Sequence, residues 1–175
     1  MVADGESAEL AKRLIADTCA KQRIEAGQLT IHADRGSSMP SKPVAFLMAD
    51  LGITNTHSRP HVSADNPYSE SQFRTLKYRP GFPERFGSLP DARAFSHEFF
   101  AWYNHEHRHS GLGLLPPAVV HHGLAPAAIE QRRAVLDAAY LAHPERFVGQ
   151  PPHPLPAPKE VWINKPQPPT ENKTQ

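Results

Sequence analysis

The stretch Ile31-His32-Ala33-Asp34-Arg35-Gly36-Ser37 follows directly from an apolar run, and residues 29–32 predict a short β-strand. A second stretch, Asp65-Asn66-Pro67-Tyr68-Ser69-Glu70, predicts the start of a helix with Glu70 in its first turn. Asp34 and Glu70 have 35 residues between them. Two carboxylates on regular elements suit a hard divalent cation, so the sequence predicts part of a metal site for chemistry on phosphodiesters. The alternative is that Asp34 caps a turn and that Glu70 is an exposed acid of a helix.

The elements around Asp34 follow the order strand, helix, strand. Helical periodicity predicts helices over residues 6–23 and 41–51, and a second short strand is expected over residues 53–58. This order is typical of a parallel βαβ unit. Gly52 is the expected C-terminal cap of the second helix, Cys19 is expected in the core, and His32 is expected to pack or hydrogen-bond beside the Asp34 strand.

The helix that carries Glu70 has an expected cap at Asp65 or Asn66. Glu70, Arg74 and Lys77 are spaced i, i+4 and i+7, so they share one face. Arg74 and Lys77 are therefore candidates for contacts with DNA phosphates, while a surface ion pair between Glu70 and Arg74 is the alternative. Phe73 and Leu76 are expected to face a core.

The second half of the chain is predicted to be helical. Helices are expected over residues 90–106, 116–122 and 125–142, and nine prolines follow from residue 144 onward. We predict a partial catalytic core over residues 1–124, a C-terminal helix over 125–143 and a largely irregular Pro-rich tail over 144–175. His105, His107 and His109 lie two residues apart on a helix end, so they are not expected to converge on zinc.

Composition narrows the class of protein. The chain has 175 residues, 39% of them hydrophobic, enough for one domain with a core. Its net charge of +1 means that binding to DNA would need a local basic patch. A single cysteine, Cys19, excludes an internal disulfide, and neither a signal peptide nor a membrane span is evident. A cytoplasmic location is the expectation.

Several sequence motifs resemble those of bacterial insertion-sequence transposases with a retroviral-integrase-like catalytic core. The matching segments are His32-Ala33-Asp34-Arg35-Gly36-Ser37, Ser58-Arg59-Pro60, Asp65-Asn66-Pro67-Tyr68-Ser69-Glu70-Ser71-Gln72-Phe73, Thr75-Leu76-Lys77, Trp102-Tyr103-Asn104, His109-Ser110-Gly111-Leu112, Pro116-Pro117 and Val161-Trp162-Ile163-Asn164. They occur in the family's order and span nearly the whole chain. The resemblance implies an α/β, RNase H-like fold (the integrase catalytic core), here expected to be truncated at the N-terminus and to have a helical C-terminal extension.

The resemblance also implies roles for single residues. The family uses an Asp-Asp-Glu triad that binds Mg²⁺ or Mn²⁺, in which Asp34 matches the second Asp and Glu70 matches the Glu. Lys77 matches a basic position that contacts transposon-end DNA. The first Asp of the family lies on a strand that precedes the helix at residues 6–23, and that strand is absent from this sequence. Whether the chain is an enzyme is therefore left open.

The expected function is that of a transposase or integrase catalytic core, although an incomplete one, for DNA transposition and integration by metal-dependent phosphodiester cleavage and strand transfer. The expected partners are DNA (the ends and target of a mobile element) and a second copy of the chain or an intact transposase, and no membrane. The alternative is a non-catalytic DNA-binding or assembly fragment that works with, or inhibits, an intact transposase. A third interpretation is an RNase H-type nuclease specific for RNA–DNA hybrids.

Overall fold

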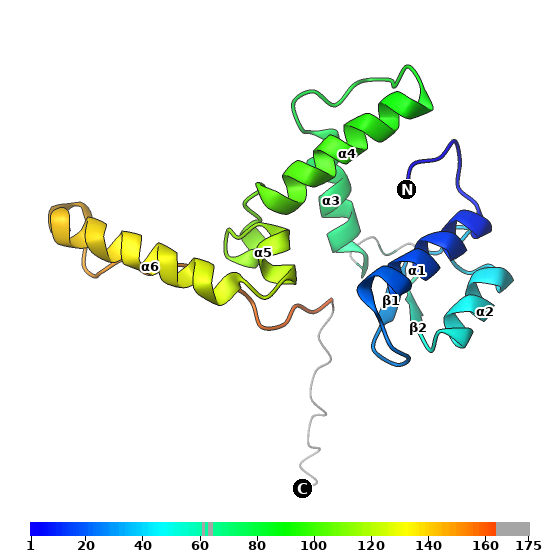
Figure 1. Ribbon diagram of the computed structural model, residues 1–175, viewed down its shortest axis with the longest axis horizontal. Helices are drawn as coiled ribbons and strands as arrows, with labels where there is room; N and C mark the ends of the chain where they lie inside the picture. The colour runs from blue at the N-terminus through cyan, green and yellow to red at the C-terminus, as the bar shows by residue number, and fades with distance from the viewer. Residues whose placement is uncertain (61, 63–64, 164–175) are drawn as a thin grey trace, which may run out of the picture. The chain divides into compact units, whose positions relative to one another are not determined.

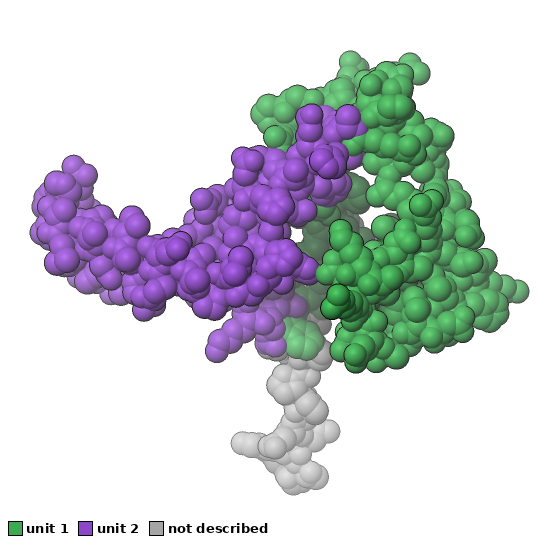
Figure 2. Space-filling view, viewed as in Figure 1, with its two compact units in different colours: residues 1–93, 162–175 green, residues 94–161 purple. Residues whose placement is uncertain are grey.

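A computed structural model describes residues 1–60, 62 and 65–163 of the chain. The chain divides into two compact units, which Figure 2 shows in different colours. Unit 1 comprises Met1–Arg93 together with Trp162 and Ile163, and unit 2 comprises Ala94–Val161. Unit 1 contains the mixed α/β part, and unit 2 is helical. In the part of the chain that the structure describes, no helix is long and apolar enough to cross a bilayer.

A parallel βαβ unit forms the centre of unit 1. β1 (Thr30–Ala33) pairs in parallel with β2 (Thr54–His57), and α2 (Lys42–Asp50) is the crossover between them. The register places Thr30 opposite Thr54 and His32 opposite Thr56. Among the described residues the sheet has these two strands. The predicted strand–helix–strand unit is confirmed, and a helical crossover is what a parallel pair requires.

Helix α1 (Ala8–Gln22) packs beside α2 in unit 1 (Figure 1). Its N-cap is Ser7, whose side-chain oxygen accepts a hydrogen bond from the Leu10 N–H at 3.2 Å. Its C-cap is Arg23, in the left-handed region at φ 53°. The helix predicted over residues 6–23 is therefore present, with both ends defined by capping contacts.

The core of unit 1 lies between these two helices and the chain that enters β2. Its buried members are Ile15, Cys19, Val44, Met48 and Ile53. Val44 is fully buried and Met48 is 2% exposed. The prediction that Cys19 is a core residue is confirmed. Burial of such apolar side chains is the main term that stabilises the α1–α2 pair.

Gly52 ends α2 and lets the chain turn into β2. Its φ of +63° is in the left-handed region, and a Cβ at this position would lie 2.7 Å from the Ala26 Cβ. The Ile53 N–H then donates to the Met48 carbonyl at 2.8 Å, and the Gly27 N–H donates to the Gly52 carbonyl at 2.9 Å. Only glycine satisfies both the backbone angle and the close approach, so its predicted capping role is confirmed in position C′, one residue after the C-cap Leu51.

Helix α3 (Pro67–Lys77) follows the sheet and begins after its N-cap, Asn66. None of its residues is buried. The expectation that Phe73 faces a core is wrong, because its side chain is 60% exposed. Leu76 is half-buried, so the contact of α3 with its surroundings covers this side chain in part and leaves Phe73 open.

Unit 2 contains most of α4 (Leu89–His105), then α5 (Pro117–His121) and α6 (Ala125–Ala142), with short 3₁₀ turns at Ser110–Leu112 and Pro144–Arg146. The predicted helices over 90–106, 116–122 and 125–142 are confirmed to within a residue at each end. Phe99 and Leu115 are its most deeply buried side chains, each 1% exposed. The Phe99 ring stacks on Tyr103 with centroids 5.7 Å apart.

His107 lies against the aromatic residues at the end of α4. Its ring is stacked on Tyr103 at 5.1 Å between centroids and lies 4.9 Å from Trp102. Burial, and then the neighbouring His109, lower the pKa of His107 below its ordinary value of 6.5. The unfolded chain therefore binds a proton at this side chain more readily than the folded one, and protons favour unfolding.

We predict that unit 2 loses stability as the pH falls through about 6.5, because the neutral His107 must then become charged in a half-buried site. Thermal unfolding followed by Trp102 fluorescence, in a Trp162→Phe background, should show a lower midpoint at about pH 5.5 than at about pH 7.5. His107→Gln should flatten this dependence, whatever it does to the midpoint itself. The matched control, His105→Gln at an exposed position of the same helix end, should keep the wild-type slope. Equal slopes for wild type and His107→Gln would contradict the prediction.

Candidate functional site

Asp34 lies immediately after β1, at the end where both parallel strands finish. Its Oδ1 accepts a hydrogen bond from the Gly36 N–H at 3.0 Å, which closes a tight turn. Its backbone carbonyl accepts a hydrogen bond from the His57 Nδ1 at 3.3 Å, across from β2. The side chain is exposed, so the strand and the turn fix its position and leave the second carboxylate oxygen accessible.

Glu70 lies in the first turn of α3 and is also exposed. Asp34 and Glu70 line the same open cleft of unit 1, about 530 Å³ in volume. Its other lining residues are Arg35, Ser58, Arg59, Pro60, Val62, Asn66, Ser69 and Phe73. The two predicted metal ligands, far apart in sequence, are thus brought to one cavity.

Arg74 and Lys77 lie further along α3 and do not line this cleft. Both side chains are exposed. The Arg74 guanidinium lies over the Tyr78 ring, 6.0 Å from its centroid. Among the described residues no ion pair joins Arg74 to Glu70, so Arg74 is placed against an aromatic ring rather than against the carboxylate.

An ion pair beside the cleft has no counterpart in the sequence predictions. Asp65 is 5% exposed and binds Arg59 through three hydrogen bonds. Its Oδ2 accepts from the Arg59 backbone N–H at 2.9 Å and from Nε at 2.8 Å, and its Oδ1 accepts from Nη2 at 2.8 Å. These bonds, and then the charge of Asp65, raise the pKa of Arg59. Asp65 was one of two expected helix caps, but its carboxylate is used to close this loop, and Asn66 takes the N-cap position.

Arg35 is the second guanidinium that lines the cleft. Its Nε donates to the Ser58 carbonyl at 3.1 Å, so the side chain is tied to the residue that follows β2. Two arginines therefore flank Asp34 and Glu70, each held by an acceptor on the chain leaving β2 or on the loop that follows it. Arg35 and Arg59 both lie within sequence motifs that resemble those of the transposases. Their place in these motifs was the signal from which the sequence analysis could have named them as site residues.

The expectation that His32 forms hydrogen bonds beside the strand before Asp34 is confirmed. Its Nδ1 lies 2.9 Å from the Thr56 Oγ1, across the sheet, and its Nε2 lies 3.0 Å from the Asp65 carbonyl oxygen. A third neighbour is the Ser58 Oγ, 3.3 Å from Nε2. The ring thus contacts β2 and the residue that precedes the N-cap of α3.

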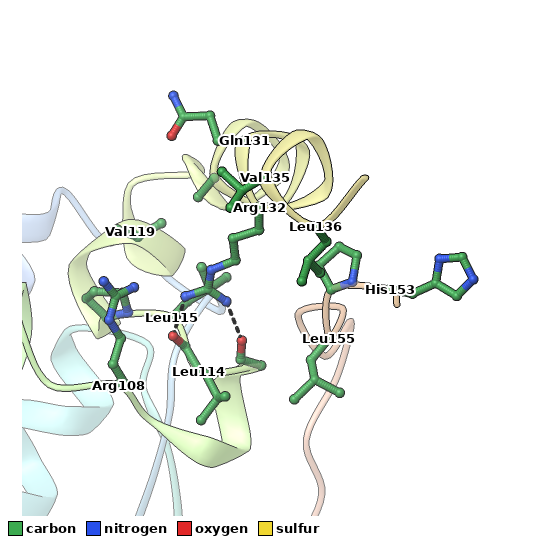
Figure 3. A pocket seen from close by; sticks show the side chains of 14 residues that line it. Arg108, Leu114, Leu115, Val119, Gln131, Arg132, Val135, Leu136, His153 and Leu155 are labelled. Atoms are coloured by element: carbon green, nitrogen blue, oxygen red, sulfur yellow. Dashed lines mark hydrogen bonds between the residues drawn. The ribbon is translucent and has the colours of Figure 1, made fainter. Parts of the chain in front are cut away.

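Unit 2 has a larger cavity of about 870 Å³, between α6 and the segment around Leu114 (Figure 3). Arg132 donates hydrogen bonds to the Gly113 carbonyl at 2.7 Å and to the Leu114 carbonyl. The walls of this cavity are largely apolar and contain no Asp or Glu. This cavity therefore has none of the oxygen ligands that a hard cation needs, and it contains no predicted site residue.

The cleft of unit 1 fits a hard divalent cation in its donor chemistry. Asp34 and Glu70 offer exposed carboxylate oxygens, and Mg²⁺ is typically held by one or two carboxylates with the remaining positions taken by water and phosphate oxygens. Within the described ranges, no group of three or more His, Cys, Asp or Glu side chains is arranged to hold a metal. The site therefore provides two carboxylates, fewer than the triad that the resemblance implies.

Comparison with known proteins shows which family this chain is similar to. Residues 51–117 match the integrase core domain family. An insertion element IS600 uncharacterized 31 kDa protein from Shigella sonnei is 34% identical over 98 residues, covering 55% of this chain. The predicted resemblance to insertion-sequence transposases with an integrase core is confirmed. The match covers 36% of the Shigella protein, so this chain spans about a third of the length of that relative.

The integrase core match implies an RNase H-like fold, and the mixed α/β structure with its small parallel sheet agrees with that class. Glu70, Arg74 and Lys77 lie inside the matched residues, whereas Asp34 precedes them. The match does not test the roles of these four residues, which stay predictions. The division into segments 1–124, 125–143 and 144–175 also stays a prediction.

The Arg59–Asp65 pair beside the cleft, in which Asp65 is buried and Arg59 is exposed, yields a prediction about stability. Asp65→Asn removes the carboxylate that accepts three hydrogen bonds from Arg59. The amide NH₂ of the new asparagine cannot accept a hydrogen bond. We expect a loss of more than about 1 kcal/mol in the free energy of unfolding of unit 1, measured by urea titration. Asp17→Asn, which breaks an exposed pair with Arg13 at 3.5 Å, is the matched control and should change stability by less than about 0.5 kcal/mol. Equal effects of the two substitutions would show that the Arg59–Asp65 pair has no special weight.

Proposed function

We propose that the chain is the catalytic-core part of an insertion-element transposase, in which Asp34 and Glu70 bind a divalent cation, Mg²⁺ or Mn²⁺, for phosphodiester cleavage and strand transfer. The observation that carries the proposal is that both carboxylates line one cleft of unit 1. The family match over residues 51–117 and the related insertion-element protein support the reaction class. We also propose that this core is incomplete, because no group of three or more His, Cys, Asp or Glu side chains in the described part of the chain is arranged to hold a metal.

When bound, such a cation activates an attacking oxygen and neutralises charge that develops at phosphorus. The residues of the chain prepare the cleft for it. Asp34 is held by the turn at Gly36, and Glu70 is held in the first turn of α3. Arg35 and Arg59 lie in the same cleft, where their positive charge favours a phosphate group. Because their guanidiniums are hydrogen-bonded to Ser58 and Asp65, they are kept in place beside the two carboxylates.

The test is Mn²⁺ binding to the intact chain, measured by electron paramagnetic resonance. Asp34→Asn and Glu70→Gln should each weaken binding by about tenfold or more, because each removes one of two charged ligands. Glu98→Gln, an exposed acid of α4 that lies outside the cleft, should bind as the wild type does. If both cleft variants bind Mn²⁺ with wild-type affinity, the metal-site proposal is refuted.

Activity is measured separately, as Mn²⁺-dependent nicking of supercoiled plasmid and strand transfer from an oligonucleotide. The proposal expects any such activity to be lost in Asp34→Asn. It also expects activity to depend on a further acidic ligand, so addition of an intact transposase carrying its own first Asp should raise it.

A second function is favoured by one observation: the described part of the chain lacks a three-ligand metal group, while α3 exposes Arg74 and Lys77. On this alternative the chain is a non-catalytic module that binds DNA or assembles with an intact transposase. It expects DNA binding or transposase binding that survives Glu70→Gln. The exposed basic side chains suit contacts with phosphate oxygens, which position a protein on DNA without reading its sequence.

We predict that Lys77→Ala weakens binding to duplex DNA several-fold and lowers the salt dependence of binding by about one unit of the log–log slope, because one phosphate contact is lost. Fluorescence anisotropy over a series of salt concentrations measures both quantities. Lys42→Ala removes an exposed lysine at the start of α2 and is the matched control, with no expected change in slope. An unchanged slope in Lys77→Ala would remove this residue from the proposed DNA contact.

A further inference from the structure

His32 lies between the two elements that carry the proposed ligands. It is the third residue of β1 and precedes Asp34 by two positions. Its Nε2 contacts the backbone carbonyl of Asp65 at 3.0 Å, and Asp65 directly precedes Asn66, the N-cap of α3. The imidazole therefore links the strand before Asp34 to the start of the helix that bears Glu70.

The chemistry of the Asp65 carbonyl fixes the direction of its bond with His32. A carbonyl oxygen only accepts, so the His32 Nε2 must carry the proton that is donated to Asp65. The His32 Nδ1 contacts the Thr56 Oγ1 at 2.9 Å, and the same hydroxyl also lies within 3.4 Å of the Ile31 carbonyl oxygen. Thr56 is directly opposite His32 in the parallel register, so the sheet pairing itself orients the ring.

Asp65, whose carbonyl His32 contacts, is itself held by further hydrogen bonds. The Asp65 carboxylate binds the Arg59 backbone N–H and guanidinium, which fixes the residue whose carbonyl His32 contacts. The Glu70 N–H in turn donates to the Asn66 carbonyl at 3.3 Å, in the first turn of α3. An unbroken series of contacts thus runs from β1 through His32, Asp65 and Asn66 to Glu70.

We propose that His32 is a positioning residue for the cleft: its Nε2 bond to the Asp65 carbonyl holds the start of α3 against β1 and so sets Glu70 opposite Asp34. The value of this arrangement for metal binding rests on the proposed function. The link itself is a property of the fold, so it can be tested without any activity. A residue that merely filled the exposed face of β1 would need no partner at Nε2.

The shape of the imidazole supplies a matched pair of variants. Gln places its amide nitrogen near the position of Nε2 and keeps a donor for the Asp65 carbonyl. Asn places its amide near the position of Nδ1, so it keeps a partner for Thr56 but does not reach Asp65. Ala removes both bonds. Comparison of Gln with Asn therefore isolates the single hydrogen bond that the proposal depends on.

The first readout is Mn²⁺ affinity of the intact chain. His32→Asn and His32→Ala should weaken binding by about tenfold, the size typical of residues that orient metal ligands, and His32→Gln should stay within about twofold of wild type. A result in which Asn binds as the wild type does, or Gln binds as poorly as Ala, would overturn the proposal.

The second readout is amide hydrogen exchange over residues 65–77, which reports on the start of α3 without metal or DNA. Exchange there should be faster in His32→Asn and His32→Ala and close to wild type in His32→Gln. If Asp34→Asn and Glu70→Gln bind Mn²⁺ as the wild type does, the proposed function is refuted. The exchange pattern still decides the role of His32 in that case. If exchange is the same in all three His32 variants as in wild type, the positioning role is refuted even where metal binding holds.

Discussion

The parallel pairing of β1 with β2 determines where the groups that follow the two strands lie in the candidate site. Parallel strands end at the same edge of the sheet, so Asp34 after β1 and Ser58 and Arg59 after β2 emerge together. The register also puts His32 opposite Thr56. The pairing in turn depends on the α2 crossover and on a small core in which Val44 and Met48 are almost completely buried. Loss of that core would separate Asp34 from the loop that leads to Glu70.

The electrostatics of the cleft follow from how its arginines are held. Arg59 is held by the Asp65 carboxylate, and Arg35 is held by a neutral carbonyl. Among the described residues, no ion pair joins Asp34 or Glu70 to either guanidinium. The cleft therefore contains two arginines that are hydrogen-bonded within the chain and two carboxylates that are exposed. Such a mixture of charges suits a phosphate group that is bound to a cation.

The elements of the fold were predictable because their signals are local. Apolar periodicity and the glycine after α2 specify the helices and strands with little tertiary help. The convergence of Asp34 and Glu70 was expected from the resemblance of their motifs to those of the transposases. Local rules left one choice open and gave one wrong result. Of the two caps expected for α3, Asn66 takes the N-cap position, while the Asp65 carboxylate binds Arg59. Phe73 has the right spacing for burial but is 60% exposed.

The close approach of Gly52 to Ala26 has a consequence for sequence variation. The ideal Cβ of residue 52 would lie 2.7 Å from the Cβ of Ala26, inside the distance that two side chains tolerate. A side chain at position 52 would therefore strain the join between α2 and β2, on which the sheet register depends. Residue 52 should stay glycine among related chains whatever residue stands at position 26, a constraint on sequence that lies far from any chemistry.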